Sequence, residues 1–310
     1  MTLKYPLNET RGHGIVDFIS NFVVVNRLPE TIGYNIIYFI VGIGLSGAVI
    51  GGRILTESVD LLIILFFAVM LTKMQASVAD AIHDYSVDKD NPQKSFIASA
   101  VDSIGHQLLF TILIIELLAG IGLWGWIAIR TDTMFFFVIG LMSNLLGFIY
   151  SYPPRIKERG IFNHVVTTGV DVVGVVLPVA VVTGAVITTE LTLSLVAVFL
   201  YVFGYHVVHQ AADTVYDRES GISTFTQTVG ISESVWLAGI LTAIAGFIAA
   251  WQSYGLSAAG LMIAGLAYAL LAKSIEHESE KKKCDRIARW FRIGPWAIGI
   301  NCLFSLSLYL

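Results

Sequence analysis

Long uninterrupted apolar stretches are the feature of this sequence that most restricts its fold. Each is about 17 to 25 residues long, the length that an α-helix needs to cross the hydrocarbon core of a bilayer. Only 14% of the 310 residues are charged, whereas about a quarter are charged in soluble domains. The sequence therefore predicts an all-α, polytopic membrane protein. Its nine expected spans are residues 32–51, 59–81, 106–129, 134–150, 165–187, 191–210, 234–251, 256–273 and 290–310.

The distribution of basic residues predicts how the spans are oriented, because Lys and Arg are retained on the cytoplasmic side of a membrane. With nine spans, 16 of the 19 Lys and Arg residues fall on the side of the N-terminus. Arg53 and Arg130 fall on the opposite side, and Lys73 lies within a span. We therefore expect an integral protein of the cell membrane with a cytoplasmic N-terminus and an external C-terminus.

The chain is expected to form a single membrane-embedded domain over residues 1–310. Residues 1–31 lack the pattern of a signal peptide, and we interpret them as an N-terminal interfacial segment. Within this segment, residues 15–28 read as an amphipathic helix. Membrane lipids are expected partners, and nucleic acid is not.

Two series of aspartates end two of the predicted spans on the cytoplasmic side. Asp80, Asp84 and Asp88 recur every four residues, so that on one helix they lie within an arc of about 80°. Asp213 and Asp217 repeat this spacing after the sixth span. A solvated acidic loop would explain either series alone. Two series with the same spacing and sidedness favour a functional site, because carboxylates at a membrane boundary are energetically costly.

The residue types of the two series indicate what they bind. Carboxylate oxygens without accompanying cysteines select Mg²⁺, Mn²⁺ or Ca²⁺. Mg²⁺ held by one or two carboxylates keeps open positions that recruit phosphate oxygens. The two series therefore suggest a diphosphate bridged to the protein by metal ions, and two divalent cations would stabilise its departure.

A basic loop follows the fourth span in the segment YSYPPRIKERG. Pro153 and Pro154 end the helix, and Arg155, Lys157 and Arg159 follow directly. Such a loop commonly serves only topology or contact with anionic lipids. Because this loop shares a membrane face with the aspartates, pairing with diphosphate oxygens is favoured.

Several polar residues lie within the spans and are candidates for a cavity wall or an acceptor site. Intramembrane ionisable residues are often functional, although hydrogen bonds between helices explain them equally well. Lys73 could approach a substrate or form an ion pair with Asp171 or Glu116. The candidates are Lys73, Asn144, Asp171, His206 and His209.

In their order and placement, these motifs resemble the signature of the UbiA superfamily of intramembrane prenyltransferases. The matching elements are Asp80-x-x-x-Asp84-x-x-x-Asp88, Tyr150-Ser-x-Pro-Pro with its basic residues, and Asp213-x-x-x-Asp217-Arg-x-x-Gly221. The resemblance implies about nine helices around a central cavity open to the cytoplasmic side. It also implies Mg²⁺-dependent transfer of a polyprenyl group from its diphosphate to a lipophilic acceptor, through an allylic carbocation.

The resemblance also assigns roles to individual residues. Tyr150 would be the family's tyrosine at the reacting centre. Asp80 stands where most members have Asn, so its place among the metal ligands is open. The ligands of Mg²⁺, two ions in all with Mn²⁺ as the alternative, would be Asp84, Asp88, Asp213 and Asp217, with Asp80 as a fifth candidate. The residues expected to hold the diphosphate are Arg155, Lys157, Arg159 and Lys94, the last in a loop where many members carry an Arg-Pro pair.

The forms YSYPP and DRESGI resemble the branch that uses geranylgeranyl-type donors, such as chlorophyll synthases, archaeal ether-lipid enzymes and carotenoid elongases. A membrane terpene cyclase of the same superfamily would share these motifs. A cation transporter or channel is the alternative of another class, and it would place charges near the bilayer midplane or in broken helices. The acceptor, the prenyl chain length and the oligomeric state are not predicted.

Overall fold

The computed structural model describes residues 14–47, 55–90, 94–219, 221–291 and 293–310, so residues 1–13 of the expected interfacial segment lie outside the described part. Regular structure in the described part is helical throughout, which confirms the all-α prediction. The elements are α1 (Ile15–Val25), α2 (Leu28–Leu45), α3 (Leu55–His83), α4 (Tyr85–Asp90), α5 (Ser95–Ile104), α6 (His106–Arg130), α7 (Phe135–Ser151), the 3₁₀-helix η1 (Ile156–Glu158), α8 (Ile161–Asp171), the π-helix η2 (Val172–Val176), α9 (Leu177–Val182), α10 (Thr189–Glu219), α11 (Phe225–Val229), α12 (Ile231–Trp251), α13 (Gly255–Ile275), α14 (Glu280–Trp290) and α15 (Ile293–Tyr309).

Nine apolar helices of the described chain correspond to the nine expected spans. Seven are long and apolar enough to cross a membrane when α8, η2 and α9 count as one. The other two, α7 and α15, have 17 residues each, and α15 forms a pair with α14 that is bent by 52°. The span through α9 ends at Val182, earlier than expected, because Gly184 turns the chain with a φ of 99°. Conversely, α10 continues beyond Gln210 to Glu219 and so carries the whole second aspartate series.

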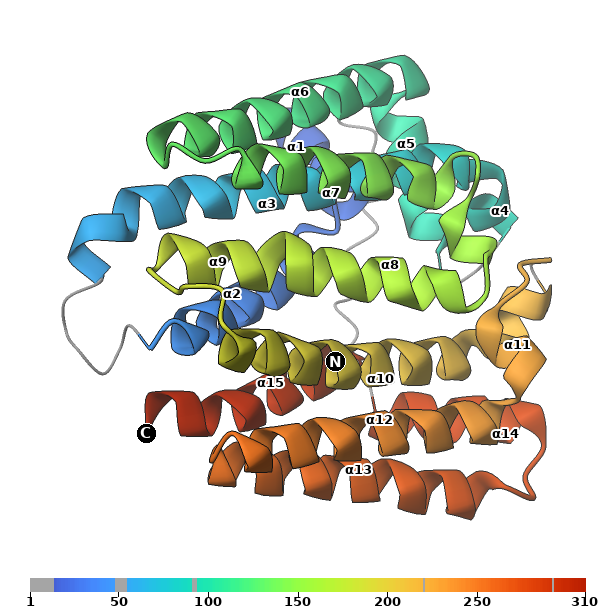
Figure 1. The fold of residues 1–310 in the computed structure, drawn as a ribbon. Helices are drawn as coiled ribbons and strands as arrows, with labels where there is room; N and C mark the ends of the chain where they lie inside the picture. Colours follow the sequence, from blue (N-terminus) through green and yellow to red (C-terminus); the bar gives the residue numbers. More distant parts are fainter. Residues whose placement is uncertain (1–13, 48–54, 91–93, 220, 292) are drawn as a thin grey trace.

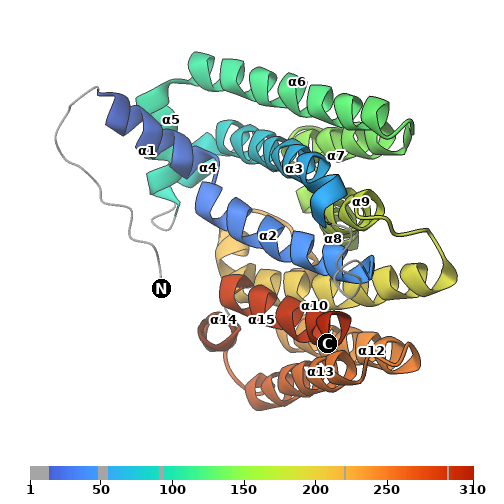
Figure 2. The same ribbon diagram turned by 90° about the vertical axis from the view of Figure 1, so that its left-hand side faces the viewer.

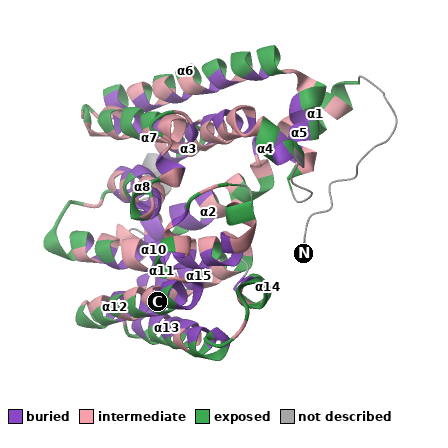
Figure 3. Cartoon of the chain, turned by 90° about the vertical axis from the view of Figure 1, so that its right-hand side faces the viewer, coloured by how far each residue is buried: buried purple, intermediate pink, exposed green. Residues whose placement is uncertain are grey.

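The long helices lie side by side in a bundle, from α6 at one edge through α3, α7, α8 and α10 to α12 and α13 at the other (Figure 1). On one face, α2 packs against α15, η2 and α9 (Figure 2). Burial is greatest in the middle: 61% of the α10 span is buried, against 33% of α6, and Figure 3 shows exposed residues along the outer helices. The outer faces are therefore available to lipid.

Both aspartate series lie at the same end of the bundle. The short helices α4, α5 and α11 are at this end (Figure 1). We call it the mouth, and it is formed by residues 80–90, the loop 152–160 and residues 213–221. The expected grouping of acidic and basic motifs on one side of the membrane therefore agrees with the fold.

A sharp turn separates α1 from α2. Arg27 adopts the left-handed conformation with φ 49° and ψ 39°, and Pro29 stands in the first turn of α2, where its missing N–H is not needed. For this reason α2 begins at Leu28, before the expected start. The expected amphipathic helix is α1, which packs against α5, where Asn21 Nδ2 donates to Ser103 Oγ over 2.8 Å.

The helix that carries the first aspartate series is not continuous, which corrects the prediction of one helix. α3 ends at His83 and α4 begins at Tyr85. Backbone hydrogen bonds of 2.8 Å from Asp84 N to Asp80 O and from Asp88 N to Asp84 O continue the turn through this break. Like charges one turn apart destabilise a regular helix, and the break coincides with the middle charge of the series.

The close packing of α2 gives the first testable prediction. A Cβ atom at Gly42 would lie 2.7 Å from Val179 Cβ and 2.8 Å from the backbone oxygen of Val176. Gly42→Ala should therefore lower stability by about 1 to 3 kcal/mol, as overpacking does in a core, and lower the unfolding temperature in detergent. Gly122→Ala is the matched control, because nothing lies within 4 Å of that Cβ. Equal unfolding temperatures for the two variants would contradict the packing.

Candidate active site

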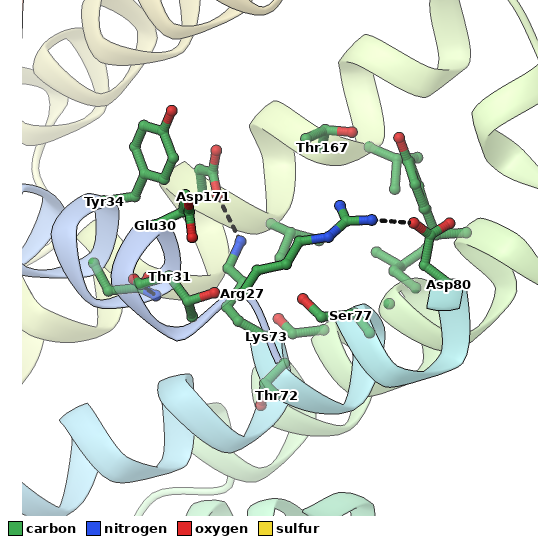
Figure 4. A pocket seen from close by; sticks show the side chains of 18 of the residues that line it. Arg27, Glu30, Thr31, Tyr34, Thr72, Lys73, Ser77, Asp80, Thr167 and Asp171 are labelled. Carbon is green, nitrogen blue, oxygen red and sulfur yellow. Dashed lines mark hydrogen bonds and ion pairs between the residues drawn. The ribbon is translucent and has the colours of Figure 1, made fainter. Parts of the chain in front are cut away.

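A cavity of about 430 Å³ lies among α2, α3, α7, α8 and α10 and extends to the mouth (Figure 4). The expected central cavity is therefore present. Its wall combines charged side chains with apolar ones such as Leu146, Val166 and Val170. The predicted site residues that line it are Lys73, Asp80, Tyr150, Asp171, His206 and His209.

Asp80 lies at the end of this cavity nearest the mouth and is held by three groups. Arg27 Nη2 is 2.8 Å from its Oδ2 (Figure 4). Lys157 Nζ and Ser151 Oγ lie 3.0 and 2.7 Å from its Oδ1. Two cations therefore neutralise this largely buried carboxylate, and their ion pairs tie the α1–α2 junction and the basic loop to α3.

The basic loop folds back onto the next aspartate of the series. Lys157, in η1, forms an ion pair with Asp84, and Arg155 Nη2 lies 3.8 Å from Asp84 Oδ1. Arg159 is exposed and instead donates from Nε to Pro154 O over 2.9 Å. Two of the three predicted basic residues therefore reach the aspartates.

Asp88 is the most buried of the five aspartates, with 2% of its surface exposed. Burial raises the pKa of this carboxyl above its usual value; Lys94 opposes the rise, and the nearby Asp80 and Asp84 add to it. Burial and the nearby Asp213 raise the pKa of Asp217 to about 6, and the charge of Lys94 opposes this rise as well. Because a metal ion binds the ionised carboxylate, protons and metal compete at Asp88.

Further contacts bring the second series to the same mouth. His209 lines the cavity, and its Nε2 lies 3.8 Å from Asp213 Oδ2. Tyr150 also lines the cavity. Asp80 itself lines the cavity, and Asp213 of the second series adjoins it through His209.

Gly221 ends the helix that carries the second series. It has a φ of 74°, and its N–H donates to Arg218 O over 3.0 Å, while Ile222 N donates to Asp217 O over 2.9 Å. These bonds form the Schellman pattern, which favours glycine because of its positive φ. The glycine of the motif therefore terminates the helix just after its last aspartate.

A second polar cluster lies deeper in the cavity around Asp171, at the end of α8. Its carboxylate accepts hydrogen bonds from Lys73 Nζ at 2.5 Å (Figure 4) and from Tyr38 OH at 2.9 Å. It is also 3.0 Å from His206 Nε2, and Tyr205 OH is bonded to Tyr38 OH. Three of the five candidates for an acceptor site thus meet here, and Lys73 is paired with Asp171.

Asn144, expected at the cavity wall, has a different place. Its buried side chain donates to Thr72 Oγ1 and Gly140 O over 3.1 and 2.8 Å, and so links α7 to α3. Conversely, Arg27 and Tyr38 line the cavity, although neither was predicted from the sequence as a site residue. A signal for Arg27 was present in the sequence, because this arginine directly precedes Leu28 and Pro29, where a helix was able to begin. No local signal marks Tyr38, because its partners come from other helices.

In the part of the chain that the structure describes, no group of three or more His, Cys, Asp or Glu side chains is arranged to hold a metal ion. In the first series, Arg27, Arg155 and Lys157 neutralise the carboxylates instead. The donor set still fits Mg²⁺, because it consists of carboxylate oxygens from two series at one mouth. A divalent cation would supply the neutralising charge and leave these basic side chains available to an anion.

Lys157→Met tests this balance of charges. Without the ammonium group, Arg27 still compensates Asp80, but Asp84 keeps only the more distant Arg155 in a largely buried site, and we expect a loss of about 3 kcal/mol of stability without metal. Saturating Mg²⁺ should recover much of the loss in unfolding temperature, because binding to the folded state stabilises it. Arg159→Met is the control, since Arg159 contacts only the Pro154 carbonyl among its described partners. If Mg²⁺ did not raise the lowered unfolding temperature of Lys157→Met, the idea that a divalent cation can take the place of the basic side chains would be wrong.

The fold is similar to those of known membrane proteins. Against a structure of digeranylgeranylglyceryl phosphate synthase, the TM-score is 0.68 with 15% identity, covering 94% of this chain and 99% of that chain. Against a UbiA homolog from Archaeoglobus fulgidus bound to DMAPP and Mg²⁺, the TM-score is 0.67 with 16% identity, covering 92% and 99%. For an apo UbiA homolog from Aeropyrum pernix K1, the TM-score is 0.57 with 14% identity, covering 87% of this chain and 96% of that chain. At these identities the likeness shows the fold alone.

The sequence comparisons add the family. None of the curated proteins matches the sequence. The UbiA prenyltransferase family matches residues 39–293, which include both aspartate series, the basic loop and Asp171 with its partners Lys73 and His206. The chain therefore belongs to the UbiA prenyltransferase family, and it is a membrane enzyme of the class that transfers prenyl groups.

Proposed function

We propose that this protein transfers a polyprenyl group of the geranylgeranyl type from its diphosphate to a lipophilic acceptor, in a Mg²⁺-dependent reaction. The observation that carries the proposal is the meeting of two aspartate series and a basic loop at the mouth of one cavity between membrane-spanning helices. Carboxylates there suit metal ions, basic side chains suit a diphosphate, and the cavity suits a hydrocarbon chain.

The ligands of related proteins support this choice. Two structures of the Archaeoglobus fulgidus homolog hold Mg²⁺ with DMAPP or GPP, which are prenyl diphosphates, and another holds Cd²⁺. The geranylgeranyl type is supported by the motif forms YSYPP and DRESGI and by the likeness to digeranylgeranylglyceryl phosphate synthase. Mn²⁺ is the alternative metal for the same oxygen ligands.

At the mouth, the aspartates would bind the metal ions and the basic residues would bind the diphosphate. Bound Mg²⁺ would stabilise the negative charge of the leaving diphosphate. Asp80 would stay paired with Arg27, whereas Lys157 and Arg155 would exchange Asp84 for diphosphate oxygens. The ligands of two Mg²⁺ ions would be Asp84, Asp88, Asp213 and Asp217. Further contacts to the diphosphate would come from Lys94 and Arg159.

The cavity would protect the allylic cation that is left when the carbon–oxygen bond breaks. The prenyl chain would lie against apolar wall residues such as Leu146 and Val170. A dry cavity keeps water from capturing the cation. The ring of Tyr150, which lines the cavity together with Asp80, would stabilise the cation electrostatically.

We infer that the mouth faces the cytoplasm, with a cytoplasmic N-terminus and an external C-terminus. The support is the distribution of basic residues in the sequence, because the expected spans put 16 of the 19 Lys and Arg residues on the same side as both aspartate series. The donor diphosphate would then reach the site from the cytoplasmic side.

A membrane terpene cyclase is the second candidate, because it would use the same mouth. In a cyclase the substrate's own double bond captures the cation, and the cavity needs to hold only a hydrocarbon chain. The charged cluster around Asp171 favours transfer, since a polar acceptor can use it and a hydrocarbon cannot.

Asp84→Asn and Asp217→Asn test the proposal. Purified protein in nanodiscs receives geranylgeranyl diphosphate, Mg²⁺ and a membrane lipid extract, and diphosphate release and product mass are measured. Each variant should lower release by at least about 100-fold, because charge stabilisation of the leaving group is lost. Asp60→Asn is the matched control: Asp60 lies on the same helix as the first series but pairs with Arg130 at the opposite end of α3.

The product mass separates the candidates. A mass equal to an extract lipid plus the prenyl group supports transfer. A mass equal to the donor less diphosphate and a proton supports the cyclase. Ion flux across the membrane without diphosphate release would overturn both.

A further inference from the structure

The cluster around Asp171 has no part in the proposed metal and diphosphate contacts, yet it is tightly connected. Groups from three other helices converge on this one carboxylate: Tyr38 from α2, Lys73 from α3 and His206 from α10. All four side chains line the cavity. A buried ion pair is a weak way to stabilise a fold, because desolvation offsets the attraction. Ionisable residues among membrane helices are accordingly taken as functional by default.

The backbone beside Asp171 supports a functional role. α8 ends at this residue and the π-helix η2 follows directly. Single π-helical turns are rare in proteins, and many of those that occur lie at functional sites. The core beside the turn is closely packed, since a Cβ atom at Gly174 would lie 2.6 Å from Ser143 Oγ of α7. Asp171 therefore lies at an irregular turn that packs closely against α7.

Two helices set the depth of the cluster below the mouth. Lys73 and Asp80 are seven residues apart on α3, and His206 and Asp213 are seven residues apart on α10. At 1.5 Å per residue, both cluster residues lie about 10 Å along the helix axis from the first aspartate of their series. With diphosphate and metal at the mouth, this distance leaves room for one compact polar group, such as a phenol ring or a glycerol unit, beside the reacting carbon.

We propose that this cluster binds the acceptor, that the acceptor reacts through a hydroxyl group, and that His206 removes the hydroxyl proton; this rests on the proposed prenyl transfer. Because Nε2 of His206 faces the Asp171 carboxylate, the neutral ring carries its proton at Nε2 and a lone pair at Nδ1. No hydrogen bond with another described residue involves Nδ1. Lys73 and Tyr38 keep Asp171 ionised and oriented, so Asp171 is a positioning residue.

The transfer step balances with these groups. The bond between C1 of the prenyl group and the diphosphate oxygen breaks, and its electron pair leaves with the diphosphate. The acceptor oxygen then forms a bond to C1, and its proton passes to His206 Nδ1. Asp171 stabilises the resulting imidazolium, which loses the proton to water after the products leave.

His206→Ala with chemical rescue tests the proposal. The assay uses nanodiscs, geranylgeranyl diphosphate, Mg²⁺ and the membrane lipid extract, and measures the ether product by mass. The variant should lose transfer by at least about 100-fold, the usual effect of losing a general base. Added imidazole should restore it at least about tenfold, because the truncated side chain leaves space for the free base. Mg²⁺ with the donor should still raise the unfolding temperature as in the wild type.

Two further variants separate catalysis from structure. Asp171→Asn should lower kcat with an unchanged KM for the donor, and imidazole should not restore it, because the imidazole ring is still present but misdirected. His164→Asn is the matched control. His164 is a buried histidine bonded to Gln210 at 3.0 Å and is not among the residues lining this cavity, so transfer should continue at the wild-type rate. Acetylating the free hydroxyl groups of the extract should abolish the ether product.

Each contrary result has a distinct meaning. Wild-type transfer by His206→Ala, or a loss that imidazole does not restore, would overturn the role of His206. An unchanged product from the acetylated extract would overturn the hydroxyl acceptor. No transfer product from the wild type with the untreated extract would overturn the proposed function itself.

Discussion

Neutralisation of carboxylates at a membrane boundary is the constraint on which the rest of the site depends. Asp80 and Asp84 carry their charges where little water reaches, and isolated charges in such surroundings are strongly unfavourable. Lys157 contacts both, and Arg27 contacts Asp80. These ion pairs draw the basic loop and the α1–α2 junction onto the end of α3. The mouth is therefore assembled by charge pairing, whereas the bundle below it is assembled by apolar packing.

In the candidate site, regular helices set the distances between residues, and irregular backbone positions orient individual side chains. Lys73 and Asp80 lie on α3, and His206 and Asp213 lie on α10, so helical rise sets the distance between the deep cluster and the first aspartate of each series. Irregular positions aim the side chains: the left-handed Arg27, the break at Asp84 and the π-helix after Asp171. An acidic mouth and a polar cluster farther in are thus placed by the same two long helices.

Much of the fold could be predicted from the sequence. The nine apolar stretches correspond to nine helices of the described chain because their length follows from bilayer thickness and not from any partner. The grouping of the motifs at one end followed from spacing and sidedness alone. The errors lie where helices begin, bend or end, at Leu28, Asp84 and Val182. At those places a turn or a contact with another segment overrides the apolar pattern.

The sequence by itself determined the spans and the positions of acidic and basic residues along them, because hydrophobic length and helical period act within one segment. Only the tertiary structure decided which cation meets which carboxylate. Arg27 pairs with Asp80 across 53 residues, and Lys73 pairs with Asp171 across 98. No local pattern encodes such pairs, because they depend on the order in which the helices pack around the cavity. That order made Arg27 a site residue and moved Asn144 away from the cavity wall.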